Sequence, residues 1–280
     1  MAPSKEVEAR IALLARTGDI ELIPMKSVKE QLSVVPKDTT VAVTCSAKFG
    51  IDRTVDYAEL LAKAGHRIRV HLPARQVPDR AYLAELVERL GSLGVQELHV
   101  VGGDVEEPVG KYGAAAELIE DLSTMEHGFD ISVACYPEGH PHISDKVLME
   151  ALQRKQPYAT FMINQLCFDP GVLVSWLRSM REAGITLPLR MGLAPPISPT
   201  KLLDLSMKIG VGTSMRYLSK QHGMLGTLLR GKFYKPERLL AQLGDALVSP
   251  EMHIDGLHIF SFNQLQHTVE WQQRVGGHVG

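Results

Sequence analysis

The stretch TTVAVTCSAKFGIDRTVDYAELLAKAGHRIRVHL, residues 39–72, decides the fold because it contains one complete strand-helix-strand unit. A β-rich run at Thr39–Ser46 is followed by Thr54–Ala64, where apolar residues recur at three- and four-residue spacing. Gly65, a residue type common just after helices, follows this segment, and a second β-rich run occupies Arg67–Leu72. This order predicts two parallel strands joined by a crossover helix.

The same alternation runs through the rest of the chain. Eight β-rich runs are predicted as strands: Asp19–Pro24, Thr39–Ser46, Arg67–Leu72, Glu97–Val101, Asp130–Tyr136, Thr160–Gln165, Leu187–Leu193 and Leu257–Phe262. Helical spacing predicts helices at Thr54–Ala64, Arg80–Leu93, Ala114–Met125, Asp145–Gln156 and Pro170–Ala183. Eight strands alternating with helices over 280 residues predict an α/β protein, a (β/α)8 TIM barrel that forms a single domain over residues 1–280.

One connection is longer than the others. Between the seventh and eighth strands, from Ser198 to Glu251, the spacing predicts extra helices at Pro199–Ile209 and Glu237–Ala246. An open, doubly wound α/β sheet is the alternative fold. It is disfavoured because the first strand is not followed by GxGxxG and no GxxxxGK[ST] occurs, so both glycine-based nucleotide fingerprints are missing.

Composition narrows the class of protein. The formal net charge of −2 predicts no nucleic-acid partner and no anionic membrane surface as a partner. Cys45, Cys135 and Cys167 are widely spaced in apolar runs, which favours a reducing compartment, and no CxxC or Cys/His cluster predicts a metal. No apolar run of 18 residues and no signal-like N-terminus occurs, so we expect a cytoplasmic protein.

Polar residues gather at the predicted C-terminal ends of the strands, where the active sites of (β/α)8 barrels lie. They are Glu21, Thr44, Cys45, His71, Asp104, Tyr136, Glu138, His140, Gln165 and Asn263. Carboxylates, imidazoles, a phenol and amides converging on one mouth suit acid/base chemistry on a planar heterocycle.

Glu21 is the most informative of these residues. A carboxylate within an apolar strand needs a partner or has a raised pKa, and either condition suits a general acid. The alternative is that Glu21 points outward from a half-exposed strand. Asp104 has a helix N-cap or turn role as its alternative, and His71 and His140 have structural roles as theirs.

The segment Asp130-Ile131-Ser132-Val133-Ala134-Cys135-Tyr136-Pro137-Glu138-Gly139-His140-Pro141 closely resembles the signature of the methylenetetrahydrofolate reductase family. Further similar segments follow in the family's order: Glu21 with Ile23-Pro24, Val41-Ala42-Val43-Thr44, His71-Leu72, Gly102-Gly103-Asp104, Ile163-Asn164-Gln165-Leu166-Cys167-Phe168-Asp169, Gly192-Leu193-Ala194-Pro195 and Phe262-Asn263. The resemblance therefore extends over nearly the whole predicted barrel.

This resemblance implies an oxidoreductase that uses NADH or NADPH to reduce 5,10-methylenetetrahydrofolate to 5-methyltetrahydrofolate, usually through FAD and for methionine synthesis. It implies Glu21 as the general acid and Asp104 as the carboxylate that stabilises the iminium cation. By the same resemblance, Gln165, Phe168 and Asn263 bind the folate substrate, and Gln165 pairs with the pterin edge. Thr44, His71, Tyr136 and His140 bind the cofactor.

Three departures from the family pattern bear on the flavin. Gly102 stands where the family usually has an arginine, Cys45 stands where an aromatic residue is common, and the spacing from His140 to Arg154-Lys155 is slightly shorter. Losing a cation beside a pyrophosphate removes a contact worth about 1.5–3 kcal/mol. We therefore expect this chain to resemble the flavin-independent actinobacterial branch, in which hydride passes directly from the nicotinamide to folate.

A fourth departure concerns the folate tail. Gln264 follows Asn263 where the family commonly has an arginine, so we expect other residues, such as Arg230 or Lys232, to meet the glutamate tail. Two other functions stay open: a pterin-binding methyltransferase on the same barrel, and a catalytically degenerate folate- or flavin-binding protein. The sequence does not decide between NADH and NADPH, the oligomeric state or the physiological direction.

Overall fold

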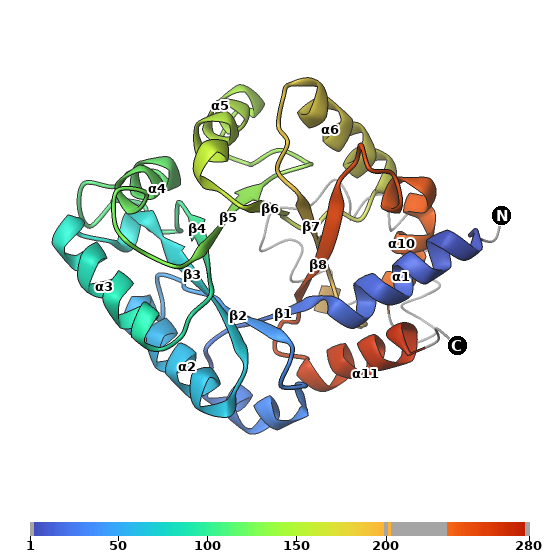
Figure 1. The fold of residues 1–280 in the computed structure, drawn as a ribbon, viewed down its shortest axis with the longest axis horizontal. Coiled ribbons are helices and arrows are strands. Elements are labelled where there is room, and N and C mark those ends of the chain that lie inside the picture. Colours follow the sequence, from blue (N-terminus) through green and yellow to red (C-terminus); the bar gives the residue numbers. More distant parts are fainter. Residues whose placement is uncertain (1–2, 199–200, 203–233, 278–280) are drawn as a thin grey trace.

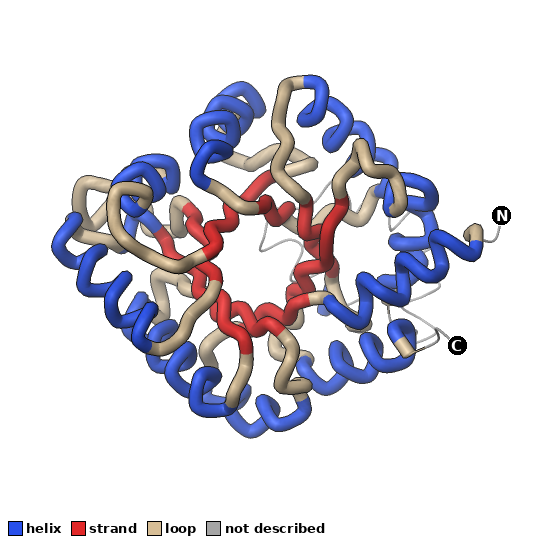
Figure 2. The backbone as a smooth tube through the Cα atoms, in the orientation of Figure 1, coloured by secondary structure: helices blue, strands red, loops and turns tan. Residues whose placement is uncertain are grey.

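Eight parallel strands close into a barrel in sequence order, from β1 to β8, in the computed structural model, which describes residues 3–198, 201–202 and 234–277. The strands are β1 (Asp19–Leu22), β2 (Thr40–Val43), β3 (Arg67–Pro73), β4 (Glu97–Val101), β5 (Asp130–Cys135), β6 (Phe161–Asn164), β7 (Leu189–Leu193) and β8 (Ile254–Phe260). Figure 2 shows the strands as a closed ring inside a ring of helices. The predicted (β/α)8 barrel is confirmed.

Helices cover the outside of this ring (Figure 1). They are α1 (Lys5–Thr17), α2 (Gly50–Ala64), α3 (Arg80–Ser92), α4 (Ala115–Leu122), α5 (Asp145–Lys155), α6 (Pro170–Glu182), α10 (Pro236–Leu243) and α11 (Leu265–Gly276). Within the described residues, four 3₁₀ helices lie in the connections: η1 (Lys26–Val34), η2 (Ala74–Gln76), η3 (Gln156–Tyr158) and η4 (Gly244–Leu247). The first and last helices, α1 and α11, pack against each other, which brings both ends of the described chain to one side of the barrel.

Local sequence signals explain where several helices begin and end. Asp79 and Ser144 cap α3 and α5 by accepting hydrogen bonds from the backbone N–H groups of Tyr82 and Val147. Helix α2 ends at Gly65, which adopts a left-handed conformation (φ 80°) that a residue with a Cβ rarely adopts. These signals lie within a few residues of each helix end, so they can be read from sequence.

Successive side chains of each strand point alternately to the outside and to the inside of the barrel. Outward-facing apolar residues such as Ile20, Val41 and Leu98 are fully buried in the main hydrophobic core, which lies between the strands and the helices. The intervening positions carry polar side chains: Asp19, Glu21, Arg69, His71, Glu97, His99, Ser132, Arg190 and His258. They contact one another across the barrel, so they line its interior.

Several predicted boundaries differ from the observed ones. Seven strands differ by one to three residues at one or both ends from the ranges expected, and β4 agrees at both ends. Strand β8, which was expected at Leu257–Phe262, differs most when both ends are taken together. It begins earlier, at Ile254, and ends at Phe260 because Phe262 and Asn263 have positive φ values of 49° and 58° that end the extended backbone.

The long connection after β7 is described only in part. Most of the helix predicted at Pro199–Ile209 lies outside the described residues, as do Arg230 and Lys232. The helix predicted at Glu237–Ala246 is divided into α10 and η4 at Gly244, whose φ is 52°. The expectation of a single domain over residues 1–280 stays a prediction. Within the described ranges, none of the helices has the length and apolar character needed to cross a membrane.

Candidate active site

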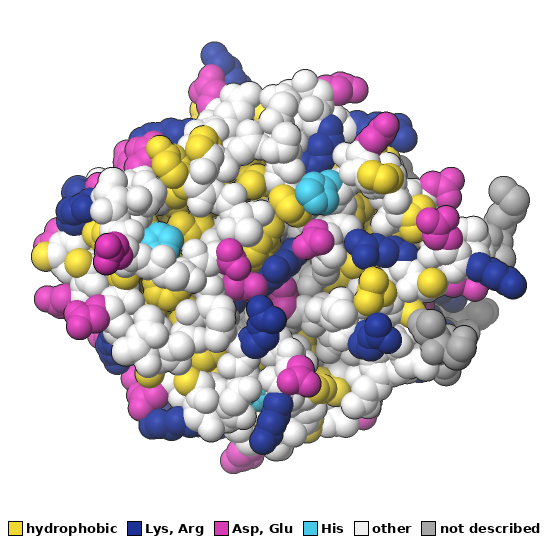
Figure 3. All heavy atoms as spheres, in the orientation of Figure 1, with side chains coloured by type: hydrophobic (Ala, Val, Ile, Leu, Met, Phe, Trp, Pro, Cys, Tyr) yellow, Lys and Arg dark blue, Asp and Glu magenta, His cyan; other side chains and the backbone are white. Residues whose placement is uncertain are grey.

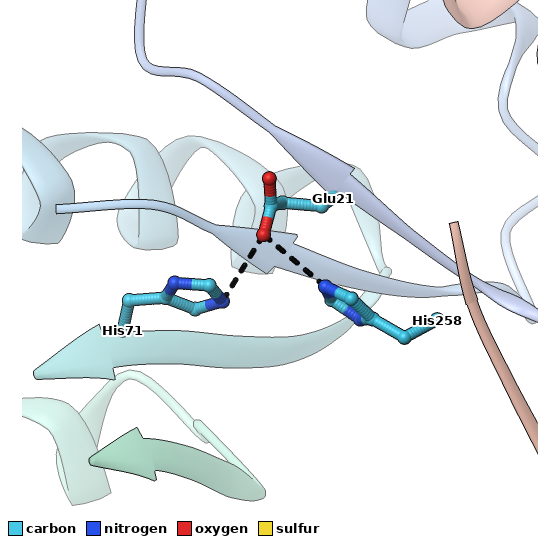
Figure 4. A group of neighbouring side chains, drawn as sticks. All are labelled: Glu21, His71 and His258. Carbon is cyan, nitrogen blue, oxygen red and sulfur yellow. Dashed lines mark hydrogen bonds and ion pairs between the residues drawn. The ribbon is translucent and has the colours of Figure 1, made fainter. Parts of the chain in front are cut away.

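Glu21 lies inside the barrel with its carboxylate between two imidazoles (Figure 4). Its Oε2 is 3.1 Å from His258 Nε2 on β8 and 3.6 Å from His71 Nε2 on β3. The side chain is 11% exposed, so one side of the carboxylate can be reached while its other contacts are sheltered. The expectation that Glu21 is an inward-facing carboxylate with a partner agrees with this geometry, and the outward-facing alternative does not.

His258 connects Glu21 to a second carboxylate. Its Nδ1 makes a short hydrogen bond with Asp19, which the barrel register places directly opposite His258 on the neighbouring strand. Burial acts to lower the pKa of His258, but Asp19 and Glu21 raise it above its ordinary value. Burial also acts to raise the pKa of Asp19, but Arg69 and His258 hold it well below its usual range.

A layer of ion pairs lies on the Asp19 side of this cluster. Arg69 Nη2 is 2.9 Å from Asp19 Oδ2, and Arg69 Nε donates to Glu97 Oε2 at 2.7 Å. Arg190 Nη1 donates to Glu97 Oε2 at 3.0 Å, and its guanidinium lies 3.7 Å from the ring centroid of Phe161. Figure 3 shows acidic and basic side chains side by side over the centre of the face that looks down the barrel.

The interior charges balance when His258 is protonated. Asp19, Glu21 and Glu97 are then matched by Arg69, Arg190 and His258, the last as an imidazolium. Buried charges are tolerated when they are paired and hydrogen-bonded in this way. The barrel interior therefore favours a protonated His258 on grounds of charge as well as of hydrogen bonding.

His71 and His99 differ from His258 in their protonation. Burial lowers the pKa of His71 to about 4, and burial also lowers the pKa of His99 well below its ordinary value. The two rings lie 4.7 Å apart between centroids, and His99 Nδ1 is 2.9 Å from the hydroxyl of Ser132. Both imidazoles are therefore neutral at pH 7, and the buried Nε2 of His71 faces Glu21 without a hydrogen-bond partner among the described residues.

The ligand atoms of Glu21, His71 and His258 lie within 4.8 Å of one another, a spacing compatible with a bound metal ion. Arg69 Nη1, 3.1 Å from His258 Nδ1, places a positive charge beside the group, and repulsion from that charge disfavours a second cation there. We interpret it as an acid/base cluster.

The rim of the barrel holds other residues expected at the site. Thr44 follows β2, and its N–H donates to the carbonyl of Leu22, one residue after Glu21. Asp104 is exposed in the loop after β4 and lies close enough to Tyr136 to influence its pKa, which burial raises. Tyr136 contacts His140 edge-to-face at 5.2 Å between centroids. These four residues lie around the mouth into which the Glu21 side chain opens.

The three residues expected to bind folate have different surroundings. Gln165 follows β6, and its side-chain oxygen accepts from the N–H of Leu166 at 2.8 Å. Phe168 is 2% exposed and packs edge-to-face on Tyr234 in a small separate hydrophobic cluster. Asn263 uses both amide atoms on the backbone of Ile23, at 2.9 and 3.0 Å, and so joins the loops after β1 and β8. Their roles in substrate binding stay predictions.

Sequence reasoning missed most of the barrel interior. Asp19, Arg69, Glu97, His99, Ser132, Arg190 and His258 were not singled out. The available signal was polar residues at every second position of several β-rich runs, as in Arg67-Ile68-Arg69-Val70-His71. In a parallel barrel whose outer face is covered by helices, that spacing places the polar side chains inside.

Fold and cluster together define the chain as a (β/α)8 barrel protein with a cluster of carboxylates, imidazoles and guanidinium groups inside the barrel. The methylenetetrahydrofolate reductase family profile matches residues 23–211, which is more than half of the chain. The chain belongs to the methylenetetrahydrofolate reductase family.

Three curated relatives are similar at lower coverage. A 5,10-methylenetetrahydrofolate reductase of Pectobacterium carotovorum subsp. carotovorum is 27% identical over 205 residues, 72% of this chain and 66% of that protein. Methylenetetrahydrofolate reductase 2 of Saccharomyces cerevisiae is 28% identical over 139 residues, 45% of this chain and 23% of that protein. Methylenetetrahydrofolate reductase (NADH) 1 of Zea mays is 25% identical over 146 residues, which are 45% of this chain and 24% of that protein. The chain spans less than two thirds of the length of each relative.

Proposed function

We propose that this protein reduces 5,10-methylenetetrahydrofolate to 5-methyltetrahydrofolate, using a reduced nicotinamide dinucleotide as the hydride donor and no flavin. The observation that carries this proposal is the Glu21 carboxylate, which opens at the barrel mouth and is hydrogen-bonded to His258. Family membership supports the substrate class, and the name of the Zea mays relative supports NADH as the donor. The wide spacing of Cys45, Cys135 and Cys167 supports a cytoplasmic location.

The chemistry requires one proton and one hydride in each turnover. Glu21 protonates the departing nitrogen of the methylene bridge, its bond to the bridge carbon breaks, and an iminium cation forms at the other nitrogen. Hydride then adds to the bridge carbon and produces the methyl group. Asp104, on the rim, stabilises the positive charge while the iminium exists. Gln165, Phe168 and Asn263 hold the folate.

Neither Gly102 nor the two cations at the end of α5 offers a free positive charge to a flavin pyrophosphate. A Cβ on Gly102 would meet no atom within 4 Å, so open space replaces the family's arginine there. Arg154 donates twice to Glu120 at 2.6 Å, and Lys155 is buried with its Nζ 3.4 Å from the carbonyl of Ala134. Both cations at the end of α5 are therefore directed to other contacts. This supports direct transfer from the nicotinamide, held by Thr44, His71, Tyr136 and His140.

The experiment that tests this function begins with an absorbance spectrum of freshly purified protein. The same sample then receives NADH or NADPH with methylenetetrahydrofolate and no added flavin. We expect no flavin band and oxidation of the dinucleotide only when folate is present. A flavin band would overturn direct transfer, and a colourless protein without folate-dependent oxidation would overturn the reductase itself in favour of a binding protein or methyltransferase.

Glu21→Gln tests the assignment of the general acid. The amide keeps the size of the side chain and a hydrogen bond to His258 but has no proton to deliver. We expect kcat to fall by about 10²–10⁴-fold while folate still binds. Equal kcat values for the variant and the unmodified protein would remove Glu21 from the mechanism.

A further inference from the structure

The proton that Glu21 delivers must be replaced in every turnover. Only 11% of the Glu21 side chain is exposed. In the proposed reaction the substrate nitrogen must lie at that opening, because Glu21 protonates it. The source of the proton is therefore best sought among the groups that contact Glu21 inside the barrel.

His258 has a carboxylate at each of its ring nitrogens. Its Nε2 lies 3.1 Å from Glu21 Oε2, and its Nδ1 makes a short contact with Asp19. The His258 side chain is 1% exposed and that of Asp19 is 4% exposed, so water cannot substitute for either hydrogen bond. Arg69 Nη1, which can only donate, also lies 3.1 Å from Nδ1, but the contact of Nδ1 with Asp19 is the shorter one and is the one that an N–H at this position makes. A neutral imidazole has a single N–H and satisfies one carboxylate, whereas an imidazolium has two and satisfies both.

We propose that Asp19, His258 and Glu21 form a proton-delivery triad in which Asp19 holds His258 as an imidazolium and His258 supplies the proton that Glu21 passes to the substrate. His258 is a positioning residue that acts through Glu21. The proposal deepens the proposed reductase function and rests on it for the role of Glu21.

The surroundings of His258 support this assignment. The titratable and charged groups that interact with His258 are Asp19 and Glu21 on β1, Arg69 and His71 on β3, and His99 on β4. Behind them, Glu97 on β4 pairs with Arg69 and with Arg190 on β7. His71 and His99 are neutral at pH 7, and the two arginines are matched by Asp19 and Glu97. One positive charge on His258 then balances the charge of Glu21.

The proton step conserves atoms and charge. The N–H bond at His258 Nε2 breaks as a proton moves to Glu21 Oε2, and the new O–H bond breaks as the proton moves to the departing nitrogen. His258 is left neutral, with its Nδ1–H still donated to Asp19, and Glu21 is left as a carboxylate. After product leaves, a solvent proton enters through the exposed side of Glu21 and restores the imidazolium. No electrons are transferred in these steps.

The test reads the protonation of His258 directly in the free protein, by ¹⁵N NMR of histidine-labelled enzyme. The chain has 11 histidines, so the His258 signals are assigned by their loss in His258→Gln and by their shift in Glu21→Gln. We expect an imidazolium with both nitrogens protonated at pH 7. In Asp19→Asn we expect the titration midpoint of His258 to fall by about one pH unit or more. A singly protonated, neutral His258 at pH 7 in the unmodified protein would overturn the triad.

Kinetics provide the second readout. His258→Gln keeps a donor toward Glu21 but cannot carry an extra proton, so we expect kcat to fall by about 10²-fold with KM for both substrates nearly unchanged. Asp19→Asn is expected to lower kcat more at pH 8 than at pH 6, because its His258 loses the proton at lower pH. His99→Gln is the matched control, since it removes another buried imidazole of the interior that bonds to Ser132. It is expected to retain kcat.

The outcomes separate this proposal from the proposed function. An unmodified protein that turns over while His258→Gln and Asp19→Asn keep its kcat and pH profile would overturn the triad and leave the reductase function standing. An unmodified protein that shows no folate-dependent oxidation would overturn the reductase function, and the NMR measurement would still decide whether Asp19 holds His258 protonated. Should His258→Gln fail to fold, the unmodified protein, Glu21→Gln and Asp19→Asn still give the NMR result.

Discussion

Arg69 Nη2 lies 2.9 Å from Asp19 Oδ2, and the two side chains are 0% and 4% exposed. Arg69 also donates to Glu97, so one guanidinium on β3 connects a carboxylate on β1 with a carboxylate on β4. These contacts place a charged network where other barrels often have branched apolar side chains. The network holds Asp19 in position beside His258.

Removing Arg69 tests how strongly the fold depends on this network. Arg69→Met leaves Asp19 and Glu97 buried with less compensating charge, so we expect the free energy of unfolding to fall by about 3–5 kcal/mol. Urea denaturation at pH 7 measures this change, as a lower free energy of unfolding and a lower midpoint urea concentration. Arg154→Met is the control, because its pair with Glu120 is exposed and is expected to leave the midpoint nearly unchanged. Equal midpoints for Arg69→Met and the control would contradict a structural role for the network.

The lowered pKa of His71 predicts that the free energy of unfolding falls in acid. Its pKa is lowered from 6.5 to about 4 in the folded protein, so the unfolded chain binds a proton that the folded protein does not bind between these values. Stability therefore falls as the pH decreases from about 6.5 to about 4, by about 3 kcal/mol from this group.

Urea denaturation across that pH range measures the effect, and His71→Gln is expected to flatten the pH dependence by about one proton. His267→Gln, on the surface of α11, controls for the loss of an imidazole. An unchanged slope in His71→Gln would show that this residue is not held neutral.

Because Lys155 is buried, we expect its replacement by an apolar residue to stabilise the fold. Lys155 is 8% exposed, lies on the wall of a pocket beside Trp176, and contacts the carbonyl of Ala134. Burial lowers the pKa of Lys155 to about 8, so below pH 8 the folded protein bears the cost of a buried cation. We expect Lys155→Met to raise the free energy of unfolding at pH 7 by about 1–3 kcal/mol, with a smaller gain near pH 10.

The same variant tests the flavin interpretation. If Lys155 has no part in holding a cofactor, Lys155→Met keeps folate-dependent NADH oxidation. A stabilised variant that has lost activity would show instead that the buried amine takes part in binding. Thermal unfolding and the NADH assay, run on one preparation, give both results.

Asp104→Asn tests the electrostatic contribution of the rim. The carboxylate is exposed, so solvent weakens its effect on the cation, and we expect kcat to fall by about 10-fold while KM changes little. Glu106→Gln removes an exposed charge two residues further along the same loop and is expected to retain kcat. The loss in Asp104→Asn should grow at low ionic strength. Identical kinetics in the two variants would remove Asp104 from the site.

From its position and its unpartnered Nε, we expect Arg75 to contact the nicotinamide dinucleotide. Its N–H donates to the carbonyl of Gly102 at 2.9 Å, so it lies beside the position where the family usually has an arginine. Its buried Nε has no hydrogen-bond partner among the described residues. We expect Arg75→Gln to raise KM for NADH by about 10-fold, the loss of one charge-assisted contact to a phosphate. Arg89→Gln, which removes an exposed pair with Asp52, is the control.

Much of the fold could be predicted from sequence because its signals are local. The order of strands and helices follows from apolar spacing, and caps such as Asp79 and Gly65 lie next to the helices they end. The end of β8 could not be predicted in this way. Its apolar pattern continues to Phe262, but the turn there is set by Ser261, whose hydroxyl donates to the backbone of Glu21 on another strand.

In the candidate site, too, features that depend on local sequence could be predicted, and features that depend on contacts between distant residues could not. By itself, the sequence determined the barrel, the family resemblance and the residues at strand ends, including Glu21, because each depends on residue type and spacing along the chain. Only the tertiary structure decided that Glu21 meets His258, 237 residues away, and that Asp19 lies at the other nitrogen of the same ring. The physical reason is the closure of the barrel: pairing β8 with β1 sets the register that brings these three side chains together, and the two carboxylates raise the pKa of His258 against the effect of burial.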